Sequence, residues 1–293
     1  MGKNAPRLTR RELVTTSLGM MGTAALPGTV RGAARVPDLP GRLKQAVCRW
    51  PFADLPLDTL CRLATDLGMV AIDLLPPDDW PRVRDLGLVC SMGTPTTRRD
   101  FIARGFNDPA NHPLLLGELE TAIPLAASHG MPNVIAMVGN RTTRSDEEAI
   151  AQCVAGLSVI APLAEEHRVT ICLEMLNSKV DHKGFQGDRT AFGLGIVQGV
   201  GSPRVKLLYD IYHMQIMEGD VIRTIRDHRE HIAHFHTAGV PGRHELDPSQ
   251  ELNYPGIAAA IADLGFTGYL AHEFLPTRPP ADGLREAVAA CTV

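Results

Sequence analysis

Four side chains that can bind a metal ion or move a proton each close a short apolar run in the second half of the chain: Glu174, Asp210, His236 and Glu273. The runs that they close have the length and composition of buried strands and cover residues 170–174, 205–210, 232–236 and 269–273. A charged group at the end of a buried strand is costly unless something compensates it. Four such groups, one per consecutive strand, predict convergence on a divalent cation.

Alternation of side chains along these runs indicates which residues line one face. Glu174 shares its face with Cys172 and Thr170, and His236 shares its face with His234. Two Glu, one Asp and one His form a mixed oxygen and nitrogen donor set, which suits Mg²⁺, Mn²⁺ or Co²⁺ and is a poor match to a sulfur-rich structural zinc site. Any one of the four alone would be read more simply as a salt-bridged core residue. His234 is predicted to be a hydrogen-bonded core histidine rather than a ligand.

The elements that must position these residues alternate regularly from Leu43 onward. Four further strands are predicted at residues 43–48, 70–74, 88–92 and 134–138. Candidate helices cover residues 57–67, 80–86, 113–129, 146–166, 189–200, 220–228, 254–264 and 282–290. Eight strand–helix pairs predict an α/β protein with the (β/α)8 TIM barrel fold, in which the chemistry lies at the carboxyl ends of the strands. An open doubly wound sheet is the alternative, but no GxGxxG motif follows a strand.

The first 36 residues are predicted to be an export signal, followed by one catalytic domain over residues 37–293. Thr9-Arg10-Arg11-Glu12-Leu13-Val14 precedes a modest apolar stretch, an arrangement that resembles a twin-arginine signal. That stretch, residues 13–26, is too short and too rich in glycine to span a membrane. We therefore expect a periplasmic or other extracytoplasmic protein without stable membrane insertion. A disordered basic tail is the alternative.

The charge argues against one class of function, and the cysteine spacing argues against disulfides. Residues 1–36 hold six of the 29 basic residues and one acid, so the remainder has a net charge of minus 9, which argues against binding nucleic acid. An endonuclease would also require further metal-binding histidines and a basic groove. The six cysteines form no CxxC pair, and buried free thiols are predicted.

Several short motifs stand at the ends of the predicted strands: Val47-Cys48-Arg49-Trp50, Ile72-Asp73-Leu74-Leu75, Leu173-Glu174-Met175-Leu176-Asn177-Ser178-Lys179, Tyr209-Asp210-Ile211-Tyr212-His213-Met214-Gln215, His236-Thr237-Ala238-Gly239, Pro241-Gly242-Arg243-His244-Glu245, Glu251-Leu252-Asn253-Tyr254 and Glu273-Phe274. Together they make residues 43–278 resemble the hydroxypyruvate isomerase family. That family lies within the xylose-isomerase-like barrels, which also include the ketose 3-epimerases.

The resemblance implies a metal-dependent isomerisation. Glu174 and Glu273 match two family carboxylates that touch the metal and exchange protons with the substrate, and Asp210 and His236 match the remaining ligands. Interconversion of hydroxypyruvate and tartronate semialdehyde passes through an enediolate, whose negative charge a divalent cation stabilises. Two carboxylates on opposite sides of the substrate can then act as base and acid.

The resemblance also implies contacts to the substrate, which we expect to be a small hydroxy-oxo acid or a sugar. His213 and Arg243 match positions that contact substrate oxygens. Arg243 is the first choice for holding a carboxylate because a guanidinium can bind it through two bonds, and Lys179 is a weaker candidate. His182, on the loop after the fifth strand, and Trp50, after the first strand, are further candidates for the pocket, although Trp50 could equally serve packing.

Two other functions are alternatives to hydroxypyruvate isomerisation. A ketose 3-epimerase or another sugar isomerase would need a larger pocket and no group to hold a carboxylate. A non-enzymatic, exported carbohydrate-binding barrel would not need the complete set of acids and metal ligands. Barrels of this type often pair, so a homo-oligomer is a further expectation that the sequence leaves open.

Overall fold

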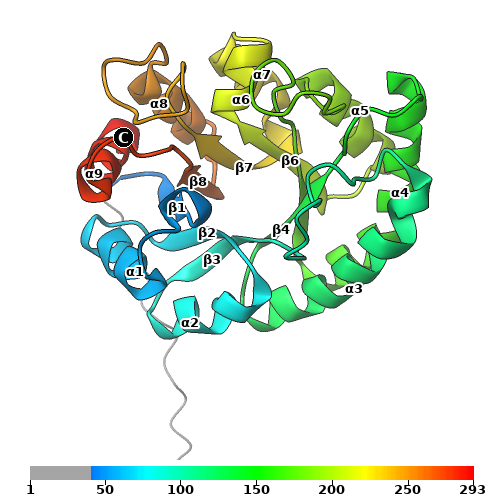
Figure 1. Ribbon diagram of the computed structural model, residues 1–293, viewed down its shortest axis with the longest axis horizontal. Coiled ribbons are helices and arrows are strands. Elements are labelled where there is room, and N and C mark those ends of the chain that lie inside the picture. Colours follow the sequence, from blue (N-terminus) through cyan, green and yellow to red (C-terminus); the bar gives the residue numbers. More distant parts are fainter. Residues whose placement is uncertain (1–40) are drawn as a thin grey trace, which may run out of the picture. The chain divides into compact units, whose positions relative to one another are not determined.

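The computed structural model describes residues 41–293, in which eight parallel strands close into a barrel in chain order (Figure 1). The strands are β1 Lys44–Cys48, β2 Ala71–Leu75, β3 Val89–Gly93, β4 Asn133–Met137, β5 Thr170–Glu174, β6 Val205–Asp210, β7 Ile232–Thr237 and β8 Tyr269–His272. Parallel pairing of β1 with β8 closes the ring. The predicted (β/α)8 barrel is therefore confirmed, whereas the predicted export signal over residues 1–36 lies outside the described residues.

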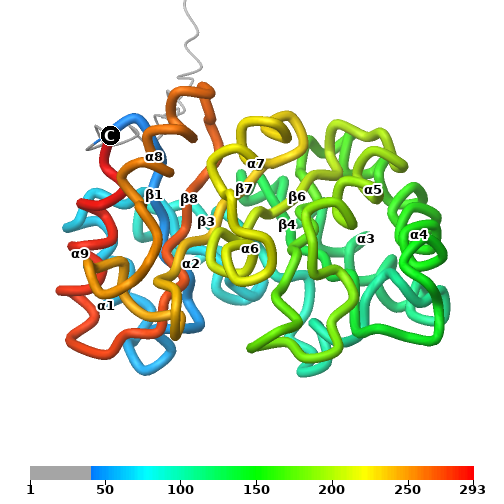
Figure 2. Tube along the Cα trace, turned by 90° about the horizontal axis from the view of Figure 1, so that it is seen from above, coloured from blue at the N-terminus to red at the C-terminus, as the bar shows by residue number. Residues whose placement is uncertain are grey.

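Helices form an outer ring around the strands, as the end-on ribbon and the view turned by 90° both show (Figures 1 and 2). They are α1 Leu57–Asp66, α2 Trp80–Asp85, α3 His112–Ser128, α4 Asp146–His167, α5 Thr190–Val200, α6 Ile211–Met217, α7 Val221–His228, α8 Tyr254–Asp263 and α9 Pro280–Cys291. The sequence patterns did not predict α6. This helix begins directly after β6 without any break in the apolar run, and the Asp210 carboxylate caps it by accepting a hydrogen bond from the backbone N–H of His213 at 3.0 Å.

Two apolar layers result from the alternation of side chains along the strands. Val47 and Ile72 point outward and pack under the helices in the large core between sheet and helix ring. Ala46, Ala71 and Ala271 point inward and form a small cluster inside the barrel with Cys48. These small, buried side chains fill the interior of the barrel at their level. The acidic residues of the site sit at one end of this packed core.

Among the described residues, α4 alone has the length and apolar composition of a membrane span. It begins with a capping box, in which Ser145 and Glu148 satisfy each other's backbone N–H groups, and its first turn carries three acids. It packs between α3 and α5 in the outer ring. Its apolar character is thus accounted for by the barrel that it covers.

All six cysteines are free and buried, which confirms the prediction from their spacing. Burial raises the pKa of Cys61 to about 11 and that of Cys153 and Cys291 to about 12. Because the thiolate is the reactive form, we expect an aromatic disulfide reagent at pH 8 to label none of the six in the folded protein within minutes, and all six in denaturant. Rapid labelling of a native thiol would contradict this packing.

Candidate active site

Glu174, Asp210, His236 and Glu273 converge at the carboxyl end of the barrel. Each contributes one ligand atom, and these atoms all lie within 4.8 Å of one another. The Nδ1 atom of His236 is 3.2 Å from Oε1 of Glu174 and 3.1 Å from Oε2 of Glu273. Glu174 and Asp210 are the last residues of their strands, and Glu273 follows the last residue of β8. Parallel strands in a closed barrel bring such positions to one mouth.

Asp73, on β2, orients the histidine of this cluster from below. Its Oδ2 atom accepts hydrogen bonds from Nε2 of His236 at 2.8 Å and from Nε2 of His234 at 2.9 Å, and its Oδ1 atom accepts from Ser91 at 2.7 Å. Because a carboxylate can only accept, Nε2 of His236 carries a proton, and Nδ1 is the ring nitrogen that faces Glu174 and Glu273. The prediction that His234 is a hydrogen-bonded core histidine is confirmed.

The donor set fits a divalent cation on two grounds. Oε1 of Glu174 and Nδ1 of His236 are buried and have no hydrogen-bond partner, although both atoms point into the cluster. Buried polar atoms of this kind normally have partners, so their convergence indicates a group that they both bind. Three carboxylates and an imidazole supply the oxygen and nitrogen donors that Mg²⁺ and Mn²⁺ accept.

The charges in the cluster support the same interpretation. Burial, reinforced by the negative charge of Glu273, raises the pKa of Asp210 to about 7, although Arg243 opposes the shift. Burial also acts to raise the pKa of Glu273, but Arg243 and His236 outweigh it and hold this pKa well below its usual range. Three carboxylates this close therefore do not all ionise easily by themselves, and a cation would relieve their repulsion.

Arg243 lies against the cluster and forms part of its wall. Its Nη2 atom donates to Oε2 of Glu273 at 2.6 Å, and its guanidinium lies 5.1 Å from the ring centre of Trp50 and 5.2 Å from that of Tyr212. Both rings make cation–π contacts with the guanidinium. Its Nε atom is buried without a partner. Trp50 in turn donates from Nε1 to Oε1 of Glu273 at 2.5 Å, so it is part of the polar wall.

His213 presents a neutral N–H group to the same space. The amide oxygen of Asn177 accepts from the backbone N–H groups of Val180 and Asp181, which fixes the side chain so that its nitrogen donates to Nδ1 of His213 at 2.6 Å. The proton of His213 is therefore on Nε2, which lies 3.5 Å from Oδ2 of Asp210. Burial, with the nearby charge of Arg243, lowers the pKa of His213 well below its usual value, so the ring stays neutral.

Of the three other residues predicted to bind substrate, two line the cavity next to this cluster and one does not. His182 stacks edge-on against His213, with ring centres 5.3 Å apart, and lines the cavity. Trp50 lines it as well. Lys179 does not reach it, because its ammonium donates to the backbone oxygens of Ile216 and Met217 at the end of α6. The positive charge of Lys179 is therefore used to cap a helix.

These residues surround a cavity of about 340 Å³. Its lining includes six of the side chains that the sequence singled out as catalytic or substrate-binding, together with an apolar wall: Trp50, Leu74, Thr94, Phe101, Ile102, Ile135, Met137, Glu174, Leu176, His182, His213, Arg243 and Glu273. The volume is in the range of small-molecule sites. The cavity is therefore the place where a substrate can meet both carboxylates.

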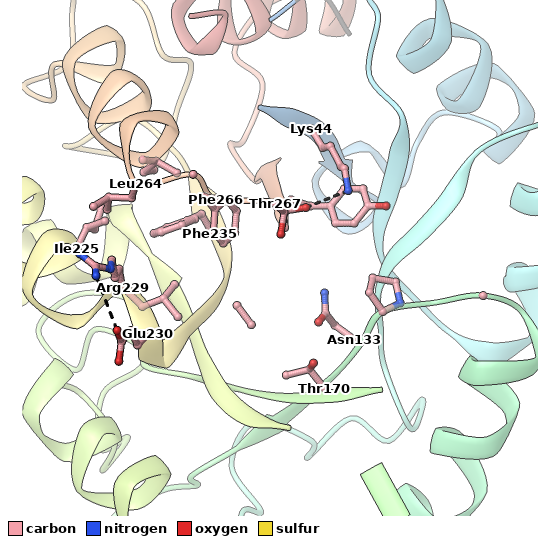
Figure 3. Close-up of a pocket in the computed structure, with 18 residues that line it drawn as sticks. Lys44, Asn133, Thr170, Ile225, Arg229, Glu230, Phe235, Leu264, Phe266 and Thr267 are labelled. Atoms are coloured by element: carbon pink, nitrogen blue, oxygen red, sulfur yellow. Dashed lines mark hydrogen bonds and ion pairs between the residues drawn. The ribbon is translucent and has the colours of Figure 1, made fainter. Parts of the chain in front are cut away.

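A larger cavity, of about 530 Å³, lies at the opposite end of the barrel (Figure 3). It is lined by the first residues of several strands, including Lys44, Asn133 and Thr170, which face Ile225 and Leu264 in the close-up. The ammonium of Lys44 donates a hydrogen bond to the backbone oxygen of Thr267 at 2.9 Å. The cavity contains none of the four clustered residues. Since catalysis in this fold occurs at the carboxyl ends of the strands, the smaller cavity is the candidate active site.

Sequence reasoning missed several residues that shape the site. Asp73 was noted only as part of a motif, although an acid inside an apolar run is the same signal that identified Asp210. Tyr212 and Asn177 gave no such signal, because their roles depend on the position of Arg243 and on the path of the loop after β5. A search for every buried strand that carries an acid would have found Asp73.

Comparison with known proteins supports the fold and the enzyme class. The family model described as xylose isomerase-like TIM barrel matches residues 61–292. A putative hydroxypyruvate isomerase from Homo sapiens is 26% identical over 266 residues, which cover 89% of this chain and 88% of that protein. A 2-oxo-tetronate isomerase from Cupriavidus necator is 33% identical over 172 residues, which cover 57% of this chain and 64% of that protein.

Solved structures share the architecture at lower identity. A family 2 AP endonuclease from Brucella melitensis has a TM-score of 0.73 at 23% identity and covers 83% of this chain and 97% of its own. A 3-keto-D-glucoside 4-epimerase from E. coli has a TM-score of 0.70 at 18% identity. The match covers 84% of this chain and 98% of the epimerase chain. At these identities the likeness extends to the fold alone.

Proposed function

The chain belongs to the xylose isomerase-like TIM barrel family, and from that membership we propose that it is a metal-dependent isomerase interconverting hydroxypyruvate and tartronate semialdehyde. That it is an isomerase follows from relatives named hydroxypyruvate isomerase and 2-oxo-tetronate isomerase. The metal, the substrate and the residue roles are our proposal. The observation that carries it is the convergence of three carboxylates and one imidazole at the catalytic end of the barrel.

The proposed cation is Mg²⁺ or Mn²⁺, with Co²⁺ as a further possibility, held by Glu174, Asp210, His236 and Glu273. When bound, it would stabilise the negative charge that develops on the substrate oxygens during proton transfer. The unpartnered Oε1 of Glu174 and Nδ1 of His236 support this assignment. Asp73 would keep His236 in the tautomer that leaves Nδ1 free.

The two glutamates would move the protons. One carboxylate takes a proton from C3 of hydroxypyruvate, and the electron pair of that C–H bond becomes the C2–C3 double bond of an enediolate. The other, as a carboxylic acid, returns a proton to C2, while the proton of the C3 hydroxyl passes to the C2 oxygen. Glu174 and Glu273 both lie against Nδ1 of His236, at 3.2 and 3.1 Å, and both line the cavity. The neutral His213 can donate to a substrate oxygen from Nε2.

Arg243 would hold the substrate carboxylate. Its Nε is a buried donor without a partner, and its side chain lines the cavity and contacts the rings of Trp50 and Tyr212. A guanidinium binds a carboxylate through two parallel hydrogen bonds, which an ammonium does not. His182 completes this side of the pocket. The proposed setting is extracytoplasmic, which rests on the twin-arginine pattern at residues 9–14.

A metal add-back assay tests the proposal. The protein is stripped with chelator, supplied with Mg²⁺, Mn²⁺ or Co²⁺, and followed by proton NMR in D₂O, where a substrate C–H that exchanges loses its signal. We expect no exchange without metal and rapid exchange of the C3 protons of hydroxypyruvate with it. Dihydroxyacetone, which differs by having a hydroxymethyl group in place of the carboxylate, should be slower by about 10- to 100-fold in kcat/KM, the value of a charged hydrogen bond.

Two outcomes would contradict the proposal. Exchange that persists at full rate after complete removal of metal would exclude the metal-dependent reaction. Faster turnover of fructose or tagatose than of hydroxypyruvate would instead favour the ketose 3-epimerase alternative, in which no carboxylate needs to be held.

A further inference from the structure

The candidate cavity has two chemically different halves. Its polar half is built from the ends of β5 to β8 and β1, which carry the charged and imidazole groups described above. Its other half comes from β2, β4 and the segments that follow β3 and β5. Its apolar residues are Leu74, Phe101, Ile102, Ile135, Met137 and Leu176. In this apolar half, Thr94 is the one described lining residue with a polar side-chain group, and its hydroxyl already donates to the backbone oxygen of Leu75 at 3.2 Å.

Leu74 enters this wall at a cost in backbone conformation. Its φ of +55° is in the left-handed region, which is a genuine outlier for a bulky residue. The pairing register of β2 with β3 shifts at the same place, between Asp73 and Leu75. Of the four described non-glycine residues with positive φ, Arg168 and Asp220 are helix caps, whereas Leu74 and Arg243 both line the cavity. Backbone strain of this kind concentrates at functional sites. Here Leu74 lies in the apolar half of the cavity and Arg243 in the polar half.

The size of the cavity also exceeds what the proposed reaction needs. Sites of about 300 to 1,000 Å³ enclose drug-sized ligands, and this one measures about 340 Å³. A three-carbon acid bound between Glu174 and Arg243 would leave the apolar half without an occupant. A sugar chain would place hydroxyl groups against side chains that cannot pair with them, which is unfavourable.

From these observations we infer that the enzyme acts on 3-hydroxy-2-oxo acids whose C3 carries an apolar substituent of about four carbons, with the substituent in the half formed by Leu74, Ile102 and Met137. The inference rests on the proposed function. The reaction is the same isomerisation: the C3–H bond breaks, a C–H bond forms at C2, and the hydroxyl proton passes from the C3 oxygen to the C2 oxygen. The 3-hydroxy-2-oxo acid thereby becomes its isomeric 2-hydroxy-3-oxo acid without an oxidant or reductant.

The test compares a series of 3-hydroxy-2-oxo acids on the metal-loaded enzyme. The C3 substituent is hydrogen, methyl, butyl, or a hydroxylated chain of the same length as butyl, and C3–H exchange is followed by NMR in D₂O. Each buried methylene is expected to raise kcat/KM by about fourfold. The butyl acid should therefore exceed hydroxypyruvate by at least about tenfold, and the hydroxylated chain should show no such gain.

A matched pair of variants locates the effect in the apolar half. Ile102→Asn changes a cavity residue that is 36% exposed, and Leu125→Asn changes an equally exposed residue on α3 that does not line the cavity. We expect the ratio of kcat/KM between butyl acid and hydroxypyruvate to fall several-fold in Ile102→Asn and to stay at the wild-type value in Leu125→Asn. A ratio near one in the wild type, with hydroxypyruvate still turned over, would overturn the inference alone. Absence of exchange with every acid would overturn the proposed function instead.

Discussion

Replacing Glu174 or Glu273 by Gln is expected to lower kcat for hydroxypyruvate by about 10²–10⁴-fold, the usual contribution of a positioned acid or base. Gln keeps the size and an oxygen donor but cannot accept and release a proton at neutral pH. The two variants should differ in D₂O. The variant that lacks the base loses exchange of the C3 protons, whereas the variant that lacks the acid keeps exchange but makes no product. This comparison assigns the direction of proton transfer, which the distances of 3.2 and 3.1 Å from His236 leave open.

Glu245→Gln is the matched control for this pair. Glu245 is also buried, at 3% exposure, and accepts hydrogen bonds from the backbone N–H and hydroxyl of Thr277. It does not line the cavity. We expect this variant to keep wild-type kcat. That result would show that the loss of a buried carboxylate outside the cavity does not by itself lower the rate of turnover. If all three variants keep near wild-type turnover, the assignment of the two glutamates is wrong. Turnover by the wild-type protein that is lost in the two site variants would exclude the carbohydrate-binding alternative as well.

Replacing Asp73 by Asn is expected to weaken metal binding by about 10- to 100-fold, although Asp73 belongs to none of the four clustered positions. The carboxylate accepts from Nε2 of both His236 and His234 through one oxygen. An amide is a weaker acceptor and lets the imidazole of His236 adopt either tautomer, so its Nδ1 is no longer held as a lone pair. Calorimetric titration of the chelator-treated protein with Mn²⁺ measures the loss. NMR of ¹⁵N-labelled histidine in the Mg²⁺-loaded protein reads the tautomer directly.

Ser91→Ala serves as the control for this experiment. Ser91 donates to the other oxygen of Asp73 at 2.7 Å, so its removal disturbs the same carboxylate without touching the histidines. Its effect on Mn²⁺ affinity should be smaller, by about the value of one neutral hydrogen bond, or severalfold. Wild-type affinity and an unchanged histidine spectrum in Asp73→Asn would show that Asp73 serves packing alone. A thermal unfolding curve for each variant separates loss of the site from loss of the fold.

These predictions share a physical basis. Burial and the nearby carboxylates make ionisation of the cluster costly, as the rise in the pKa of Asp210 to about 7 indicates. Arg243 and His236 offset part of this charge from one side, and Asp73 orients His236 from below. A cation in the centre would complete the balance. We therefore expect changes at Glu174 and Glu273 to act on proton transfer as well as on metal binding, and changes at Asp73 to act on the affinity for the metal through His236.

The fold and the four principal site residues were predictable from the chain alone. Apolar runs of four to six residues alternate with helical patterns eight times, which favours a closed barrel over an open doubly wound sheet, and in the structure the strand order follows the chain order. An acid or histidine that ends such a run carries a burial cost wherever the fold places it. Glu174, Asp210, His236 and Glu273 were recognisable for that reason.

Only the tertiary structure decided how the rest of the site is assembled. The sequence ranked Arg243 above Lys179 for its guanidinium, but only the structure shows that Arg243 reaches Glu273 whereas Lys179 caps α6. The apolar half of the cavity is likewise a product of two separate strands, β2 and β4, and of the segments that follow β3 and β5. Strand periodicity determines which side of the sheet a residue faces, whereas loop paths determine which side chains meet across the mouth of the barrel, and those paths depend on packing between elements far apart in the sequence.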